Sequence, residues 1–272
     1  MPGELAQSFT AALLQFDVAL GRPEENLARA VALLEQLPVA GDAPTLAVLP
    51  EVFTTNFTFH GAEEFAAHSG RALEKLAALA REREIAIAGS IIEAGREAGR
   101  YANRAFFIDE RGERLCHYAK RHLITIGHEH LFYEEGDDAE ARIFEWHAIP
   151  MAMAICYDLR FPEWLGRLAF AGARVFVVPA QWPRERLAHW RTLLQARAIE
   201  NQAFFLGCNR TGVMENTVFA GGSAIIDPWG EIVATDAEGA TEIVRGRVEP
   251  ALSDEVRSRL PAFNERQAQE SK

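Results

Sequence analysis

Short, wholly apolar segments recur along the chain, each about the length of one β-strand. The clearest are 45–50 (TLAVLP), 85–92 (IAIAGSII) and 175–180 (VFVVPA). Because these segments lack the in-and-out alternation of a half-exposed strand, they predict strands that are covered on both faces. The segments 23–37 and 185–201 have the apolar spacing and terminal residues of helices. The pattern therefore predicts an α/β fold in which helices cover buried sheets.

The other expected elements continue this alternation. Further strands are predicted at 9–16, at 149–155, at 203–209, in a pair within 101–120 around a D-E-R-G turn and in a hairpin at 223–235; further helices are predicted at 71–83 and 162–172. So many strands favour two packed sheets over one open sheet, although periodicity alone also permits a simple doubly wound sheet.

The chain carries no sign of a second domain. Its 272 residues contain no repeat and no linker rich in Pro, Gly or Ser. We therefore expect one domain over 1–272, with a core at about 8–250. The remainder, 251–272, is expected to be a helix followed by a polar tail.

Charge and cysteine content exclude several classes of protein. The net charge is −11, and an acidic chain repels nucleic-acid phosphates. No apolar run reaches the roughly 18 residues that a membrane span needs, and the N-terminus lacks the pattern of a signal peptide. Three widely spaced cysteines argue against a disulfide framework and for a reducing compartment. We expect a cytoplasmic protein without nucleic-acid or membrane partners.

Three reactive side chains directly follow predicted strands. Glu51 follows 45–50, Lys120 follows the second strand of 101–120, and Cys156 follows 149–155. In α/β folds, ligand sites gather outside the carboxyl ends of strands, so the three side chains can meet in one pocket. A lone cysteine is more often an inert buried thiol, which is the interpretation given to Cys116 and Cys208.

This trio supports one definite chemistry. A thiol must lose its proton to attack, and a carboxylate such as that of Glu51 can accept this proton. An ammonium such as that of Lys120 can stabilise the oxyanion that forms. The backbone N–H of Tyr157 is a second candidate donor if the chain turns into a helix after Cys156. Together these groups predict acyl transfer through a thioester, followed by hydrolysis.

A metal site is the main rival interpretation. His128, Glu129 and His130 form a dense cluster, and alternate residues of a strand would place both histidines on one side. However, no H-x-x-x-H or C-x-x-C spacing occurs and no third ligand is evident. A metal is therefore disfavoured. The glycine-rich phosphate-binding motifs are absent as well, so no nucleotide cofactor is expected.

Three sequence blocks resemble the nitrilase superfamily of carbon–nitrogen hydrolases. They are LPE (49–51), YAKRHL (118–123) and ICYDLRFPE (155–163), in the order and approximate spacing of that family. The resemblance extends from the first predicted strand to DPWGEI (227–232). Each block by itself is weak, but the three together are specific.

The resemblance implies a fold, an assembly and a catalytic set. The fold is a four-layer αββα sandwich, in which helices flank two mixed sheets, and the expected assembly is a homo-oligomer, either a dimer or a multiple of dimers. The catalytic residues are carried onto Glu51, Lys120 and Cys156. Glu129, ahead of EEGD, takes the place of the second family glutamate, which helps to orient Lys120 and the substrate amide. No cofactor is implied.

The segment 181–210 is similar to the omega-amidase subgroup, through its W-P pair, its H-W pair and A-R-A-I-E-N-Q. This likeness implies hydrolysis of the terminal amide of 2-oxoglutaramate or 2-oxosuccinamate. One alternative is another amide, such as an N-carbamyl compound or a deaminated glutathione-like peptide. A catalytically silent scaffold is a further alternative, but it gives no reason to keep all three reactive residues.

A small substrate with a carboxylate needs one cation and a partly apolar cleft. Arg160, four residues after Cys156, is the candidate cation; its structural alternative is an ion pair with Glu163 or Glu200. The candidate pocket walls are Phe53, Thr54, Phe57 and Trp182. Since aromatic residues usually belong to the core, each of these walls has a purely structural alternative.

Overall fold

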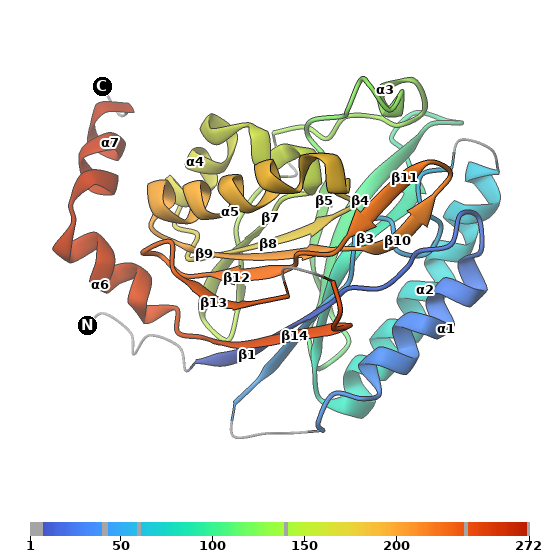
Figure 1. The fold of residues 1–272 in the computed structure, drawn as a ribbon, viewed down its shortest axis with the longest axis horizontal. Helices are drawn as coiled ribbons and strands as arrows, with labels where there is room; N and C mark the ends of the chain where they lie inside the picture. Colours follow the sequence, from blue (N-terminus) through green and yellow to red (C-terminus); the bar gives the residue numbers. More distant parts are fainter. Residues whose placement is uncertain (1–7, 40–42, 59–60, 139–140, 237–238, 271–272) are drawn as a thin grey trace.

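Two mixed six-stranded sheets form the centre of the molecule (Figure 1). The structure is a computed structural model, which describes residues 8–39, 43–58, 61–138, 141–236 and 239–270. The first sheet has the order β14 (Ile243–Val248), β1 (Phe9–Leu14), β2 (Thr45–Val48), β3 (Ala86–Ala94), β4 (Tyr101–Ile108), β5 (Arg114–Ala119). The second has the order β13 (Ile232–Thr235), β12 (Ala224–Ile226), β9 (Phe204–Asn209), β8 (Val175–Ala180), β7 (Ile149–Met153), β6 (Phe144–Trp146).

The two sheets share one internal plan. Three neighbouring strands of each sheet run parallel, namely β1, β2 and β3 in one sheet and β7, β8 and β9 in the other. Antiparallel strands flank each parallel set. Because parallel strands end at the same edge of a sheet, the residues that follow β2, β7 and β8 are brought to common edges.

Helices cover the outer face of each sheet. The helices α1 (Pro23–Leu34) and α2 (Ala62–Arg83) pack on the first sheet, and α4 (Pro162–Phe170) and α5 (Leu187–Asn201) pack on the second. The inner faces of the sheets interlock, as where the rings of Phe9 and Trp146 meet at 5.2 Å. The predicted αββα sandwich is therefore confirmed. No helix within the described ranges is long and apolar enough to cross a membrane.

The structure corrects several predicted boundaries. The helix predicted at 71–83 already begins at residue 62, and the one predicted at 23–37 ends at residue 34. A one-turn 3₁₀ segment, η2 (Arg184–Arg186), precedes α5. The elements that were not predicted include β6, α3 (Glu129–Phe132), β14 and the hairpin of β10 (Thr211–Met214) with β11 (Thr217–Ala220). β14 escapes detection because its sequence, IVRGRV, is half polar, yet it pairs along its whole length with β1.

The C-terminal segment also differs from the prediction. It forms two helices, α6 (Ala251–Arg259) and α7 (Ala262–Glu270), where one helix and a polar tail were expected. The sequence of α7 is mostly polar and carries one aromatic anchor, Phe263, whose ring lies 5.1 Å from that of Phe170. Arg257 stacks on the same ring at 3.9 Å. This buried ring, together with the hydrogen bond from Gln267 to the Phe170 carbonyl at 2.9 Å, docks a helix whose polar composition did not predict it.

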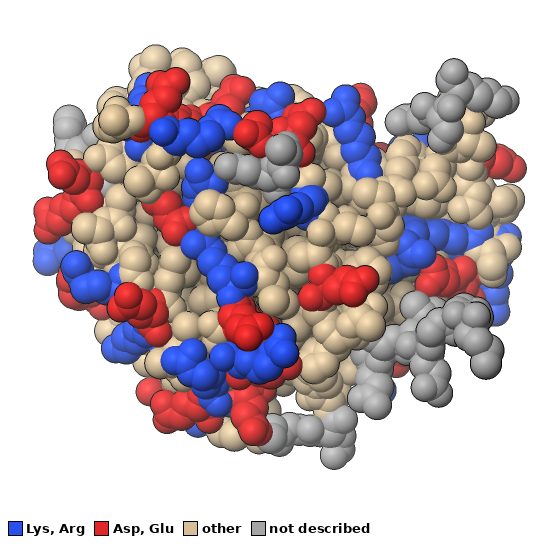
Figure 2. All heavy atoms as spheres, turned by 180° about the vertical axis from the view of Figure 1, so that it is seen from behind, with Lys and Arg blue, Asp and Glu red and all other residues tan. Residues whose placement is uncertain are grey.

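Charged side chains are interspersed on the surface. On the face drawn in Figure 2, acidic and basic residues alternate over short distances. Many exposed charges of the molecule pair: Arg247 with Glu249 at 3.1 Å and Arg121 with Glu135 at 3.1 Å are two examples. Such exposed pairs contribute little stability, on the order of 0–1 kcal/mol each.

Candidate active site

The structure brings the three strand-end residues together. Glu51 follows β2, Lys120 follows β5 and Cys156 follows β7. The Lys120 Nζ lies 2.8 Å from Glu51 Oε1, and both side chains are almost fully buried. Besides burial, the charge of Glu51 and hydrogen bonding with its side chain raise the pKa of the Cys156 thiol, so the two groups lie side by side. The Glu51 carboxylate thus adjoins both a thiol and an ammonium, which is an arrangement suited to nucleophilic catalysis by a thiol.

Glu129 completes this cluster through its contact with Lys120. Its two carboxylate oxygens accept hydrogen bonds from Lys120 Nζ at 3.0 and 2.9 Å. The backbone N–H of Ile124 donates to one of them at 2.9 Å. Glu129 begins the single-turn helix α3 (Glu129–Phe132), so the segment is not the strand on which the metal interpretation depended.

The two histidines beside Glu129 do not join its carboxylate. His128 and His130 are exposed, whereas Glu129 is 1% exposed. Among the residues that the structure describes, no group of three or more His, Cys, Asp or Glu side chains is arranged to hold a metal ion. The geometry therefore makes Glu129 a partner of Lys120 and not a metal ligand.

The charges of the cluster keep Lys120 protonated. Burial by itself lowers the pKa of Lys120, but the carboxylates of Glu129 and Glu51 more than offset this effect, so that its pKa lies well above the usual value. Burial raises the pKa of Glu129, and the Glu51 charge raises it further, while Lys120 opposes both. The cluster therefore presents a permanent ammonium to any group that becomes negative beside it.

Cys156 holds its proton in the resting site. Burial raises the pKa of this thiol well above its usual value, and the negative charge of Glu51 adds to the effect, against the opposing attraction of Lys120. A standing thiolate is thus disfavoured. Attack then requires that the proton leave during the reaction, and the Glu51 carboxylate in contact with the thiol can accept it.

Substituting Glu51→Gln is expected to separate alkylation from hydrolysis. The neutral amide removes the charge that raises the pKa of Cys156, so more of the thiol ionises at a given pH and the pH midpoint of iodoacetamide alkylation falls. Hydrolysis is lost because no base remains. Alkylation rates followed by mass spectrometry between about pH 6 and pH 10 measure the shift. Cys116, whose pKa burial raises to about 12, is the internal control; a midpoint that moves upward contradicts this account.

Two residues that the sequence did not single out orient Glu51. The Asn103 side-chain amide donates to Glu51 Oε1 at 2.8 Å. The Gln181 backbone N–H donates to Glu51 Oε2 at 3.0 Å, and its side-chain amide donates to the Glu51 carbonyl oxygen at 2.7 Å. Gln181 directly follows β8, so the strand-end rule could have identified it. Asn103 lies within β4, where no sequence signal distinguishes it.

The backbone at Cys156 makes a strained turn. Cys156 has a φ of 44° and begins the 3₁₀ helix η1 (Cys156–Arg160). A left-handed conformation at a residue other than glycine costs on the order of 1–3 kcal/mol and persists only where neighbours impose it. Tyr157, the second residue of η1, lies where backbone N–H groups lack a partner within the helix.

Asp158 is the neighbour that imposes this turn. It is fully buried and accepts hydrogen bonds from the Ile155 N–H at 2.9 Å, the Tyr118 hydroxyl at 2.8 Å and the His122 N–H at 2.9 Å. The first of these bonds holds the residue before Cys156. The other two hold the segment that carries Lys120. One carboxylate thus fixes the relative positions of the thiol and the ammonium.

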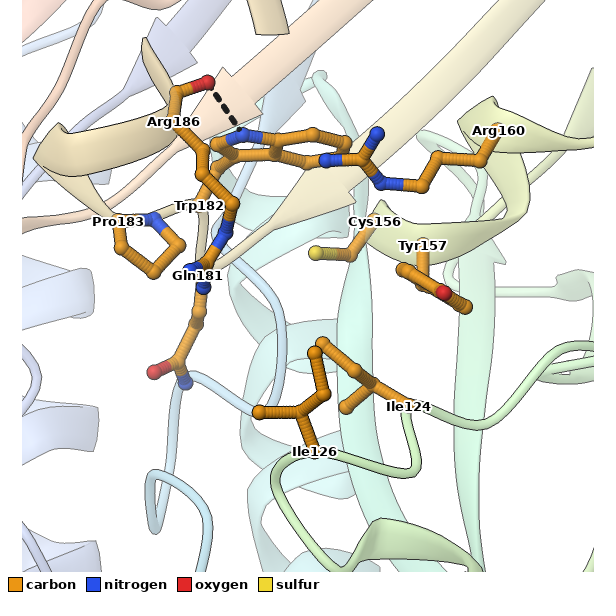
Figure 3. Close-up of a pocket in the computed structure, with 9 residues that line it drawn as sticks. All are labelled: Ile124, Ile126, Cys156, Tyr157, Arg160, Gln181, Trp182, Pro183 and Arg186. Carbon is orange, nitrogen blue, oxygen red and sulfur yellow. Dashed lines mark hydrogen bonds between the residues drawn. The ribbon is translucent and has the colours of Figure 1, made fainter. Parts of the chain in front are cut away.

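Cys156 opens into a small pocket of about 180 Å³. Figure 3 shows the residues that line it: Ile124, Ile126, Cys156, Tyr157, Arg160, Gln181, Trp182, Pro183 and Arg186. The wall is largely apolar, with a few polar groups from several elements, as is usual for small-molecule sites. Of the residues predicted from sequence to bind substrate, Arg160 and Trp182 lie in this wall.

The other three predicted wall residues lie elsewhere. Phe53 is fully buried in the core between the first sheet and its helices, with its ring 6.3 Å from that of Phe106. Thr54 is fully buried. Phe57 lies beside the charged cluster, with its ring 5.4 Å from Lys120 Nζ. The turn after β2 therefore directs Glu51 toward the site while its aromatic neighbours pack around it.

Arg160 does not form the ion pair that was its structural alternative. Glu200 pairs with Arg197 at 2.6 Å, and within the described residues no carboxylate pairs with Arg160. Its guanidinium instead lies over the Trp182 ring, 4.7 Å from the centroid, and 3.3 Å from the His189 ring nitrogen. It is therefore held in place by an aromatic surface, with its charge available to a ligand.

Comparison with known proteins agrees with this geometry. The model of the carbon-nitrogen hydrolase family matches residues 10–258. The 2-oxoglutaramate amidase of Bacillus subtilis (strain 168) is 37% identical over 260 residues, which are 94% of this chain and 97% of that protein. Omega-amidase YafV of Escherichia coli (strain K12) is 39% identical over 221 residues, which are 80% and 82% of the two chains.

A solved structure extends the likeness to three dimensions. The protein XC1258 from Xanthomonas campestris, a CN-hydrolase superfamily protein with an arsenic adduct in its active site, superposes with a TM-score of 0.85. It is 32% identical, and the match covers 95% of this chain and 97% of that one. Sequence, fold and the converged thiol, carboxylate and ammonium agree: the chain belongs to the carbon-nitrogen hydrolase family, whose members are hydrolases of non-peptide C–N bonds.

Proposed function

We propose that this protein is an omega-amidase, which hydrolyses the terminal amide of a small 2-oxo-acid amide such as 2-oxoglutaramate or 2-oxosuccinamate to the acid and ammonia. The observation that carries the proposal is the pocket itself. Cys156, in contact with Glu51, opens into a small cleft whose wall carries the Arg160 cation on Trp182. The names of the Bacillus subtilis and Escherichia coli relatives support the same substrate class.

The first half of the reaction forms a thioester. Glu51 takes the proton of Cys156 as the sulfur attacks the terminal amide carbon. The oxygen of the amide becomes negative and is stabilised by the Lys120 ammonium and the Tyr157 N–H. Glu129 keeps Lys120 charged and oriented, through its two contacts at 3.0 and 2.9 Å. Glu51 then returns its proton to the leaving nitrogen, and ammonia departs as the C–N bond breaks.

The second half releases the acid. Glu51, again unprotonated, takes a proton from water as the water oxygen attacks the thioester carbon. The same two donors stabilise the second oxyanion. When the C–S bond breaks, Cys156 regains a proton from Glu51 and the 2-oxo acid leaves. No step of this scheme calls for a cofactor, and Arg160 holds the distal carboxylate throughout.

A panel of amides tests the substrate class. Ammonia release is measured with 2-oxoglutaramate and an N-carbamyl amino acid, and release of cysteinylglycine is measured with deaminated glutathione, whose amide nitrogen belongs to that dipeptide. We expect 2-oxoglutaramate to have the highest kcat/KM, by at least about tenfold, because its length and charge suit a small pocket with a cation. Higher kcat/KM for either other compound contradicts the proposal in favour of that substrate. The Cys156→Ala protein controls for contaminating amidases.

We further propose a homo-oligomer, a dimer or a multiple of dimers, in the cytoplasm. Four exposed apolar residues on α5 and the β12–β13 hairpin support self-association: Ile199, Trp229, Ile232 and Val233. The Gln195 side chain donates to the Gly230 carbonyl at 3.1 Å and ties the hairpin to α5, so Ile199 lies beside the hairpin turn. Sedimentation velocity tests this expectation, and a monomer at micromolar concentration contradicts it. The three free cysteines support a reducing compartment.

A further inference from the structure

A second arginine lines the pocket beside Cys156. Arg186 ends the 3₁₀ turn η2, and its carbonyl oxygen accepts a hydrogen bond from Trp182 Nε1 at 2.8 Å (Figure 3). The backbone of Arg186 is therefore tied to the same indole ring on which Arg160 lies. Two guanidinium groups, from two separate elements, thus face one small cavity.

The guanidinium of Arg186 makes only a weak ion pair with the described residues of the protein. The one ion pair it makes within the described residues is with Glu185, at 3.9 Å, and the Glu185 side chain is 72% exposed. Arginines elsewhere form closer pairs, such as Arg174 with Asp254 at 2.7 Å. The chain has 39 acidic and 28 basic residues, so carboxylates are plentiful. Two arginines left almost unpaired around one cavity therefore indicate that the cavity receives an anion.

The rest of the lining strengthens this charge preference. Among the described residues, no Asp or Glu belongs to the pocket wall, which otherwise consists largely of Ile124, Ile126, Trp182 and Pro183. Apolar surroundings increase the energy of interaction between charges. A carboxylate in this cavity is thus attracted by both guanidinium groups. An ammonium is repelled by both and finds no acid in the wall.

We propose that Arg186 is a second substrate-binding cation, which together with Arg160 makes the pocket select amides with an anionic far end and reject those that also carry an α-ammonium. The inference rests on the amidase function proposed above and deepens it. Glutamine and 2-oxoglutaramate share the same terminal amide and chain length, and they differ at C2, where one has an ammonium and the other a carbonyl. The two arginines therefore discriminate a 2-oxo acid amide from the amino acid related to it.

The variant Arg186→Gln tests this assignment, with Arg184→Gln as a matched control from the same turn that does not line the pocket. Three amides are compared: 2-oxoglutaramate, glutamine and the uncharged butyramide. For Arg186→Gln we expect kcat/KM with 2-oxoglutaramate to fall about ten- to hundredfold, mainly through KM, because a charge-assisted hydrogen bond is lost. The kcat/KM with butyramide is expected to stay within about twofold of the wild-type value. The ratio of kcat/KM for 2-oxoglutaramate to that for glutamine is expected to fall. Arg186→Lys is expected to restore part of the loss.

The outcomes separate this inference from the function on which it rests. If the wild-type enzyme prefers 2-oxoglutaramate but Arg186→Gln behaves like Arg184→Gln, the inference is wrong and the function stands. The inference is also wrong if Arg186→Gln lowers kcat/KM for all three amides alike, because that result indicates a structural role. If the wild-type enzyme prefers glutamine or butyramide to 2-oxoglutaramate, both proposals are overturned.

Discussion

Hydrolysis is expected to fall by at least about a thousandfold when Cys156 is replaced by alanine, because the covalent route through the thioester is lost. Cys156 is the one cysteine that lines the pocket and contacts Glu51. Cys208 is fully buried and donates to the Val48 carbonyl at 3.1 Å, so it cannot replace the missing nucleophile. Ammonia release from 2-oxoglutaramate measures the loss, and circular dichroism verifies that the fold is retained.

The matched control is Cys116→Ala. Cys116 packs between the sheets, and burial raises its pKa to about 12, so we expect activity near that of the wild-type enzyme. Mass spectrometry after brief, cold exposure to 2-oxoglutaramate is expected to place an acyl adduct on Cys156. Retention of more than about a tenth of the activity by Cys156→Ala would exclude the thioester route.

Lys120→Met is expected to cause the largest loss of stability, about 3–5 kcal/mol, together with loss of activity. The substitution leaves the carboxylates of Glu51 and Glu129 buried beside each other without the cation that joins them. Removing one member of a buried ion pair is costly because the remaining charge stays desolvated. Urea unfolding measures the change, and Lys75→Met, on the exposed face of α2, is the control for the same chemical substitution.

The loss in Lys120→Met is expected to depend on pH. Burial and Glu51 already raise the pKa of Glu129, and removal of Lys120 takes away the attraction that opposes them. A carboxyl group whose pKa is higher in the folded than in the unfolded protein binds more protons when folded, so stability falls as pH rises above the unfolded value of about 4.3. Lys120→Met is therefore expected to be less stable at about pH 8 than at about pH 5.5. Equal stability at both pH values contradicts this assignment of charges.

The parts of the fold predicted from sequence are those with uniform local patterns. Fully apolar strands such as 45–50 and 175–180 must be covered on both faces, and that requirement leads to layered sheets and helices. Elements that form only through contacts with distant parts of the chain were not predicted. β14 is half polar and is a strand because β1 pairs with it; α7 is a helix docked by Phe263. Their stability comes from contacts that are far apart in sequence.

The candidate site divides in the same way. Glu51, Lys120 and Cys156 could be named together because each directly follows a predicted strand, and ligand sites in α/β folds gather outside the carboxyl ends of strands. The packing of the two sheets then brings Cys156, after β7, to Glu51 and Lys120, which follow β2 and β5 of the other sheet. No comparable rule predicts from sequence in which direction a side chain within a turn points. Phe53 follows Glu51 by two residues and lies in the core, although the sequence made it a candidate for the pocket wall. Asn103 lies in mid-strand and nevertheless donates to Glu51 at 2.8 Å.

The sequence by itself determined the family, the layered architecture and which reactive residues the chain supplies, because these depend on local patterns and on motifs. The tertiary structure alone decided which groups touch and which protons they hold. The pKa of Cys156 rises because burial and the Glu51 charge act on it together, and that of Lys120 rises because two carboxylates surround it. The tertiary structure likewise decided that Arg160 and Arg186 line the same pocket. Electrostatic effects depend on distance and on exclusion of water, and both are properties of the folded chain.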